Sequence, residues 1–133
     1  MHPNKGEERY PYPMSVRAIR GAIQVPANTP ADIAAGVQEL VSAILEGNQL
    51  LPSDVISVFF TSTIDLNAAF PAAACREMGF ANVPLLGSVE VNVPGALDRT
   101  IRAMFHVETT KPADQINHIY LHGAAALRRD IAQ

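Results

Sequence analysis

The sequence predicts an α/β protein of the α+β kind, with one mixed sheet and helices packed on one face of it. Alternating apolar residues indicate strands, and apolar residues at helical spacing indicate helices. The segments follow the order β-α-β-α-β-β-β-α, which favours this fold class. At 133 residues and 48% hydrophobic content, the chain can bury about two-thirds of its unfolded surface. We therefore expect a single domain over residues 15–133.

The first half of this domain predicts two strands with a long helix between them. Alternation of β-branched residues predicts the first strand over 16–25. Thr29 is a candidate N-cap, with Pro30 at the first helical position, and the helical pattern continues to Gly47. Residues 54–62 are almost continuously apolar, which is typical of a strand in the middle of a covered sheet.

The second half predicts a short helix and three further strands. The helix is opened by Pro71 and closed by Gly79. The next strand is interrupted by Gly87 and is followed by a turn at Pro94-Gly95. The strands and the final helical segment are expected over 83–93, 101–107, 117–121 and 123–127.

Composition argues against several classes of function. The net charge of −3, without a block of Lys or Arg, disfavours nucleic acid or an anionic membrane as the main partner. A single cysteine excludes a disulfide framework within the chain, and no segment is apolar over the length of a membrane span. We expect a cytoplasmic protein. Residues 1–14 are expected to form a flexible leader, because they are rich in charge and proline.

No motif for nucleotide binding, metal binding or a catalytic Ser-His-Asp triad is found. His118 and His122 are expected to straddle the end of a strand, where a four-residue spacing provides no common face for a metal. Cys75 has no evident base beside it and is interpreted as a small buried residue. Met104 and Phe105 are expected in the core.

Charged residues within apolar strands are the strongest functional signal. Arg20, Arg102 and Glu90 are all expected within strands. Burying a guanidinium without a partner is costly, so these residues indicate either an ion-pair network or an anionic ligand. Two strand arginines exceed the one strand carboxylate, and Arg76 and Arg128 add further positive charge. The balance favours a dianionic small molecule.

Several motifs along the chain carry a family resemblance. They are Arg17-Ala18-Ile19-Arg20-Gly21-Ala22, Asp65-Leu66-Asn67-Ala68-Ala69-Phe70-Pro71-Ala72, Val83-Pro84-Leu85, Val93-Pro94-Gly95, Ile101-Arg102 and His118-Ile119-Tyr120-Leu121. In order and spacing, these motifs resemble the AroH class of monofunctional chorismate mutases. The resemblance covers residues 16–130, which is nearly the whole chain apart from the leader.

The resemblance implies a chorismate mutase-like fold in a homotrimer, with a pseudo-α/β-barrel core and helices packed outside the sheet. It implies active sites at the clefts between subunits. The expected reaction is the isomerisation of chorismate to prephenate in phenylalanine and tyrosine biosynthesis. This reaction uses no cofactor and no metal.

The same resemblance assigns expected roles to individual residues. Arg102 is similar to the cation that faces the ether oxygen, and Glu90 to the acceptor for the ring hydroxyl. Arg20, with Tyr120, is expected to hold the carboxylate of the enolpyruvyl arm. All four are expected mainly from one subunit.

The neighbouring subunit is expected to complete the site with Phe70, Ala72 and Arg76. Phe70, Ala72 and Leu127 would form apolar walls, and Arg76 and Arg128 would guard the mouth. The further residues expected to contact the substrate are Leu85, Leu86 and Gly87.

Three positions depart from the family pattern. Gly87 stands where a well-known member has a cysteine, and Ala73 where some members have a lysine. Arg128-Arg129-Asp130 replaces the usual Arg-Pro-Asp of the tail. Two alternatives remain open here: a trimeric imine deaminase of the RidA type, and a noncatalytic trimer that binds dicarboxylates.

Overall fold

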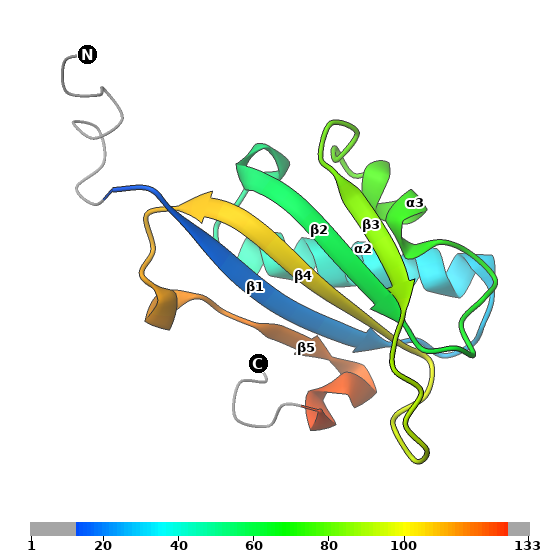
Figure 1. The fold of residues 1–133 in the computed structure, drawn as a ribbon. Coiled ribbons are helices and arrows are strands. Elements are labelled where there is room, and N and C mark those ends of the chain that lie inside the picture. Colours follow the sequence, from blue (N-terminus) through cyan, green and yellow to red (C-terminus); the bar gives the residue numbers. More distant parts are fainter. Residues whose placement is uncertain (1–12, 128–133) are drawn as a thin grey trace.

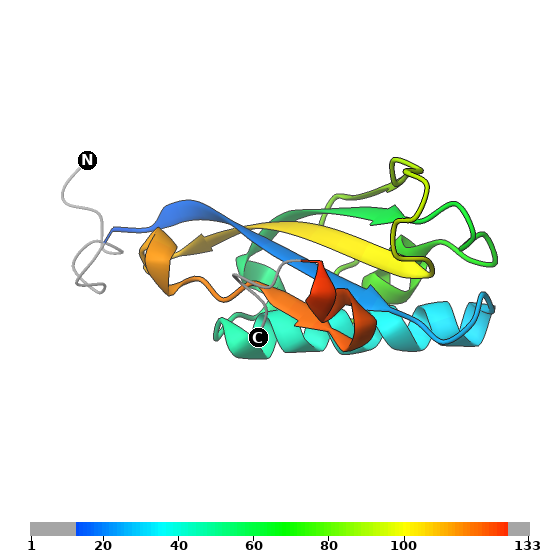
Figure 2. The same cartoon turned by 90° about the horizontal axis from the view of Figure 1, so that it is seen from below.

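The computed structural model describes residues 13–127 as a single mixed sheet with helices on one face (Figures 1 and 2). The strands are β1 (Ser15–Gln24), β2 (Val55–Ser62), β3 (Leu85–Val89), β4 (Thr100–Thr109) and β5 (Ile119–Leu121). The helices are α2 (Pro30–Gly47) and α3 (Pro71–Arg76), with short 3-10 helices η1 (Pro52–Asp54), η2 (Ala113–Gln115) and η3 (His122–Ala126). The fold class and the order of elements are confirmed, although the last helical segment is a 3-10 helix.

The sheet is built around β4, and its strand order is β3-β2-β4-β1-β5. β4 pairs antiparallel with both β1 and β2. The edge strands β3 and β5 join in parallel, to β2 and β1 respectively. Segments far apart in the sequence are therefore brought side by side at the centre of the sheet.

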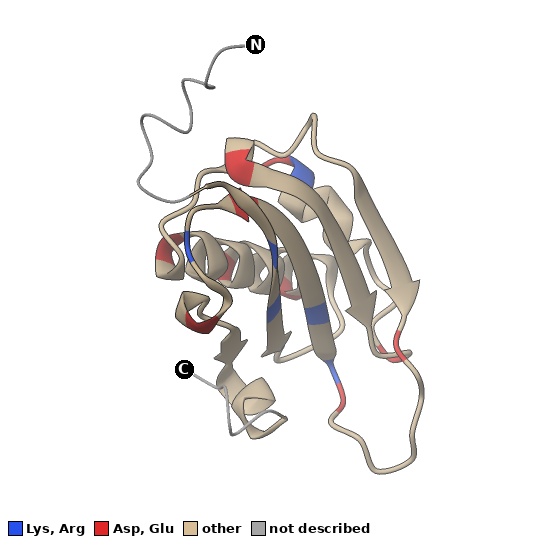
Figure 3. Cartoon of the chain, turned by 60° about the vertical axis from the view of Figure 1, so that its left-hand side comes forward, with Lys and Arg blue, Asp and Glu red and all other residues tan. Residues whose placement is uncertain are grey.

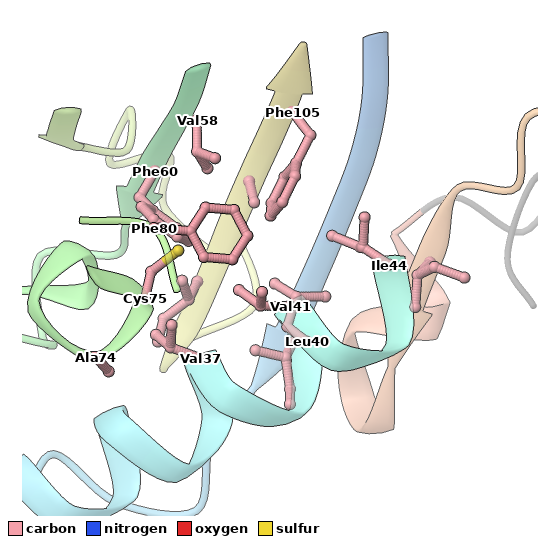
Figure 4. Packing of buried hydrophobic residues seen from close by; sticks show 14 of the residues in the cluster. Val37, Leu40, Val41, Ile44, Val58, Phe60, Ala74, Cys75, Phe80 and Phe105 are labelled. Atoms are coloured by element: carbon pink, nitrogen blue, oxygen red, sulfur yellow. The ribbon is translucent and has the colours of Figure 1, made fainter. Parts of the chain in front are cut away.

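Helix α2 supplies the layer that covers the sheet. The Thr29 side chain accepts a hydrogen bond from the Asp32 backbone N–H at 3.0 Å, which caps the first turn as predicted. One side of the helix buries Ile33, Val37, Leu40, Val41 and Ile44. Figure 4 shows several of these side chains meeting Phe60, Phe80 and Phe105 beneath the sheet. Phe80 and Phe105 pack edge to face, with ring centroids 6.1 Å apart.

The opposite face of the sheet carries no α-helix within residues 13–127, and only the short η3 packs on it, against β1 and β5 (Figure 2). Val58 and Phe60 of β2 point into the core, but Ile56 and Phe59 are each 41% exposed. The prediction that this strand is covered on both faces is therefore wrong for the single chain. An apolar strand was expected to have two buried faces, whereas here its second apolar face lies open.

Most strand boundaries differ from the predictions by one or more residues, and three differences affect the interpretation. β3 ends at Val89, so Glu90 lies in the loop that follows and not in a strand, while Gly87 lies within the strand. α3 ends at Arg76, and Gly79 adopts a positive φ of 95° in the turn beyond it. Asp54 belongs to η1, where its carboxylate accepts from the Leu51 N–H at 2.8 Å.

The described helices include none that is long and apolar enough to cross a membrane. The predicted leader lies almost wholly outside the described residues, which begin at Pro13, and Arg128 and the tail after it also lie outside them.

Candidate active site

The pairing register of the sheet gathers the charged residues. On β4, Arg102 lies opposite Ala22 of β1 and Thr61 of β2. Ala22 in turn lies opposite Tyr120 of β5. Directly paired residues project from the same face of a sheet, so these four residues form a row across the open face. Figure 3 shows the basic positions on the neighbouring strands β1 and β4.

Arg102 has a carboxylate beside it. Its Nε lies 3.4 Å from Oε1 of Glu90, but this buried N–H makes no hydrogen bond. Glu90 Oε1 also accepts a hydrogen bond of 2.6 Å from the Thr61 hydroxyl. The two charged side chains remain 35% and 26% exposed, so the pair faces an opening and is not sealed in the core.

That opening is a cavity of about 250 Å³ on the open face of the sheet. Arg20, Glu90, Arg102 and Tyr120 all line it. No acceptor for the Arg20 guanidinium is found among residues 13–127. The structure thus brings together the four residues predicted to act from one subunit, with an excess of positive charge.

Met104 also lines this cavity, so its predicted place in the core is wrong. It is paired with Arg20 across β1 and β4 and therefore lies on the open face. Phe105, one residue further on, points to the helix layer and is fully buried, as predicted. The alternation of β4 explains why adjacent apolar residues have different environments.

Tyr120 sits in a small apolar cluster beside the cavity. It is 2% exposed and groups with Ala22 and Ala124, against which Leu97 and Leu127 pack. Leu127 is therefore on the Tyr120 side of the subunit. The predicted wall residue thus belongs with the charged group in this chain, and not with Phe70.

The two residues just before the short strand β5 are held in place by side-chain hydrogen bonds. Asn48, which is 1% exposed, accepts from the Asn117 N–H at 2.8 Å and donates to the Asn117 carbonyl at 2.9 Å. His118 Nδ1 accepts a 2.9 Å hydrogen bond from the backbone N–H of Arg20. Burial lowers the pKa of His118 and favours the neutral imidazole that can accept this bond.

The remaining predicted substrate contacts lie around a second depression, of about 670 Å³, between α3 and β3. Its lining includes Phe70, Ala72, Leu85, Leu86 and Gly87. Phe70 is 82% exposed, although it is a large apolar residue. Arg76 is exposed at the end of α3 and is not among the residues that line this depression.

The two groups do not meet within one chain. Phe59 and Thr61 of β2 line the first cavity, while Phe60 and Ser62 line the second. Leu86 and Ser88, which also line the second depression, lie opposite Phe59 and Thr61 and so project from the open face, which means that this depression wraps around the edge strand β3. The two cavities share no lining residue, so the two groups form separate surfaces of the single chain.

Gly87 is one of the departures from the family pattern. A Cβ placed on it would have the Phe60 carbonyl oxygen as its nearest neighbour, at 4.0 Å. There is room for a side chain in the single subunit, so lack of space there does not explain the glycine.

Among residues 13–127, neither the histidines nor the cysteine forms a recognisable nucleophile or metal centre. His118 lies just before β5 and not within the strand as predicted, and exposed His122 follows β5 and pairs with Glu39 at 2.9 Å. Within residues 13–127 no group of three or more His, Cys, Asp or Glu side chains is placed to hold a metal ion. Cys75 is buried as expected, and burial raises the pKa of its thiol to about 12.

Sequence reasoning missed Thr61 and Asn48. Thr61 is a polar residue two positions after Phe59 in an apolar strand, and this interruption was the signal that could have identified it. For Asn48, the sequence indicated only that it lies at the end of a helix. Its hydrogen-bond partner Asn117 lies 69 residues away, so local sequence could not identify the contact.

The fold and the cavity define a class of α/β protein in which charged side chains gather on one face of the sheet. Residues 16–131 match the family model described as chorismate mutase type I. The chain therefore belongs to the type I chorismate mutase family.

Individual relatives agree with the family model. The chain is 44% identical to "Chorismate mutase AroH" of Thermus thermophilus over 87% of this chain and 96% of that protein. It is 40% identical to the protein of the same name from Bacillus subtilis, over 90% and 94%. A solved chorismate mutase from Clostridium thermocellum superimposes with a TM-score of 0.81 at 46% identity, covering 83% of this chain and 98% of that one. These comparisons do not support the imine deaminase or the noncatalytic binder.

Proposed function

We propose that this protein converts chorismate to prephenate in phenylalanine and tyrosine biosynthesis. The observation that carries the proposal is that Arg20, Glu90, Arg102 and Tyr120 line one cavity in a chain of this family. A cytoplasmic location and independence of any cofactor or metal are part of the proposal.

The rearrangement is a concerted reaction in which the ether C–O bond breaks as a C–C bond forms. Negative charge grows on the ether oxygen, and positive charge grows on the ring. A fixed cation beside the oxygen therefore binds the transition state more tightly than the substrate. We assign this role to Arg102, and we assign Glu90 to the ring hydroxyl, close to the developing positive charge.

Arg20 and Tyr120 are assigned to the carboxylate of the enolpyruvyl arm. The Arg20 guanidinium has no acceptor within the described chain and lines the same cavity as Arg102. Holding this arm restrains the substrate in its folded, reactive conformer, which contributes to the rate independently of the charge on Arg102.

We further propose a homotrimer with an active site at each cleft between subunits. Support comes from the two separate groups of site residues and from the apolar side chains that the single chain leaves exposed. Phe70, Leu86 and Val89 are 82%, 65% and 63% exposed and flank the second depression. A contiguous apolar surface of this kind is typical of a protein interface. In this arrangement, the second depression of one subunit closes the charged cavity of the next.

The experiment that tests the function is direct. Purified protein is mixed with chorismate, and the loss of the conjugated-diene absorbance is followed over time. NMR identifies the product, because substrate and product are isomers of the same mass. We expect catalysed conversion to prephenate, and no change in absorbance at micromolar enzyme would refute the proposal.

A further inference from the structure

We propose that the hydroxyl of Thr61 is a positioning group that keeps Glu90 from neutralising Arg102. This inference rests on the proposed function, because it presumes that Arg102 faces the ether oxygen and Glu90 the ring hydroxyl. Its basis is the hydrogen bonding around the Glu90 carboxylate.

Both oxygens of that carboxylate already accept hydrogen bonds within the protein. Oε1 accepts from the Thr61 hydroxyl at 2.6 Å, and Oε2 accepts from the Val91 N–H at 3.3 Å. The Glu90 backbone is fixed as well, because its N–H donates to the Ser62 carbonyl at 2.8 Å. The side chain is thus held at both ends, although it lies in a loop. Of the two carboxylate contacts, the one from Thr61 is the shorter.

Arg102 meets this carboxylate by one edge only. The closest approach is between Nε and Oε1, at 3.4 Å, and it is not a hydrogen bond. No acceptor for the two terminal nitrogens of Arg102 is found within residues 13–127. These nitrogens therefore remain available to a ligand in the cavity, which Arg102 lines.

Without a competing donor, an arginine and a carboxylate so close together would be expected to form a bidentate pair. Such a pair uses two parallel N–H···O bonds and is strongly favoured by geometry. It would place the Glu90 negative charge against the nitrogens that stabilise the ether oxygen, and weaken that stabilisation. It would also withdraw Glu90 from the ring hydroxyl. The hydrogen bond from Thr61 holds Oε1 of Glu90 out of the bidentate arrangement. This leaves Arg102 available to the ether oxygen and Glu90 available to the ring hydroxyl.

The strand register makes Thr61 suited to this task. It lies directly opposite Arg102 across β2 and β4, so the two side chains project side by side. A β-branched residue has few side-chain rotamers in a strand, which keeps its hydroxyl aimed in one direction. Valine has nearly the same shape without the hydroxyl, and serine keeps the hydroxyl without the methyl group.

The test compares Thr61→Val with Thr61→Ser in steady-state turnover of chorismate. We expect Thr61→Val to lower kcat about 10- to 100-fold, the usual loss when a hydrogen bond to a charged group is removed, with a smaller change in KM. Thr61→Ser should stay within a few-fold of the unchanged protein. Ser57→Ala is the matched control, because it removes a hydroxyl from the same strand outside the cavity.

A Glu90→Gln background tests whether Thr61 acts through Glu90. In that background, Thr61→Val should have much less effect than it has alone, because the two residues act as one unit. Thermal unfolding of each variant measures any loss of folding.

The outcomes separate the two proposals. If the unchanged protein does not convert chorismate, the proposed function fails, whatever the variants do. If it does and Thr61→Val retains full kcat, the positioning role is refuted. The role is also refuted if Thr61→Ser loses as much kcat as Thr61→Val, or if the losses in the two backgrounds simply add.

Discussion

At the scale of single residues, Arg102 shows how a charge is accommodated in an apolar strand. The sequence left an ion pair and an anionic ligand as alternatives. In the structure, Arg102 lies near Glu90 and also faces a cavity, so the two explanations are not exclusive. The guanidinium avoids a large desolvation penalty because its side of the sheet is open in the single chain.

Replacing Arg102 with lysine tests the catalytic role. Lysine keeps the charge but loses the planar fork and places its charge differently, so stabilisation of the ether oxygen should fall. We expect kcat to fall about 100- to 1,000-fold, with a much smaller change in KM. Steady-state kinetics measure both. Arg17→Lys is the control, since Arg17 is bonded instead to the Lys111 carbonyl. If substrate affinity falls as much as kcat, Arg102 serves mainly to bind the substrate and not to stabilise the transition state.

Cys75 provides a prediction that does not depend on function. Burial raises the pKa of its thiol to about 12, so the thiolate is scarce at neutral pH and inaccessible to reagents. An aromatic disulfide reagent at pH 8 should react slowly with the folded protein and rapidly with one thiol after denaturation in urea. Fast reaction of the folded protein would show that the helix layer over Cys75 opens readily.

At the scale of elements, β5 depends on Asn48 for its position. The Asn48 side chain satisfies both backbone groups of Asn117 and donates to the Ile44 carbonyl. We expect Asn48→Ala to lower the free energy of unfolding by about 1–3 kcal/mol, because buried polar groups lose their partners. Urea titration measures this loss. Asn82→Ala, in an exposed turn, should have little effect.

His118 should give the enzyme a dependence on acidic pH. Burial lowers the pKa of His118 below its ordinary value of 6.5, so the imidazole is neutral near pH 7 and Nδ1 accepts from the Arg20 N–H. As the pH falls through this lowered pKa, Nδ1 of His118 gains a proton. It can then no longer accept the hydrogen bond, and its N–H faces the backbone N–H of Arg20. The unfolded chain takes up this proton at higher pH, so stability also declines as pH falls below 6.5.

The measurement is the pH profile of kcat/KM for His118→Asn beside the unchanged protein. An asparagine oxygen can accept the same hydrogen bond without titrating, so the variant should keep its activity further into the acidic range. His122→Asn is the control, because His122 is exposed and pairs with Glu39 away from the cavity. If kcat/KM falls at the same acidic pH in His118→Asn and in the unchanged protein, titration of His118 is not the cause of the fall.

The elements were largely predictable from the sequence, because helical spacing and strand alternation report which side of each segment is buried. Thr29 and Pro30 gave the start of α2 directly. The position of Glu90 was not predictable, since valines alternate with polar residues beyond Val89 although strand pairing stops there. The clamp between Asn48 and Asn117 joins distant segments, and local pattern carries no information about such pairs.

At the scale of the whole molecule, the single chain has two separate cavities, which we propose to be the two halves of one site. The charged cavity lies on the open face of the sheet, and the apolar depression lies between α3 and β3. The sequence resemblance assigned residues to both halves. The structure shows that the two groups line separate cavities of one subunit, with no lining residue in common. In the proposed trimer, the charged cavity of each subunit meets the apolar depression of its neighbour, so that both become part of a complete site.

Mixed trimers of Arg20→Ala and Arg76→Ala subunits test that assembly. Each variant alone should be impaired at every cleft. If Arg20 and Arg76 at one site come from different subunits, every mixed trimer contains one cleft in which neither is replaced. Unfolding and refolding the two variants together should therefore restore about one-third of normal activity to each mixed trimer.

The control for that experiment mixes Arg20→Ala with Arg102→Ala subunits. Both residues line the same cavity of one chain, so every subunit carries a damaged charged half. No cleft regains a full set, and mixing should restore no activity. Restoration in the first mixture and none in the second would place the site between subunits. Restoration in neither would mean that Arg76 acts in the same subunit as Arg20, and the proposed arrangement of clefts would be wrong.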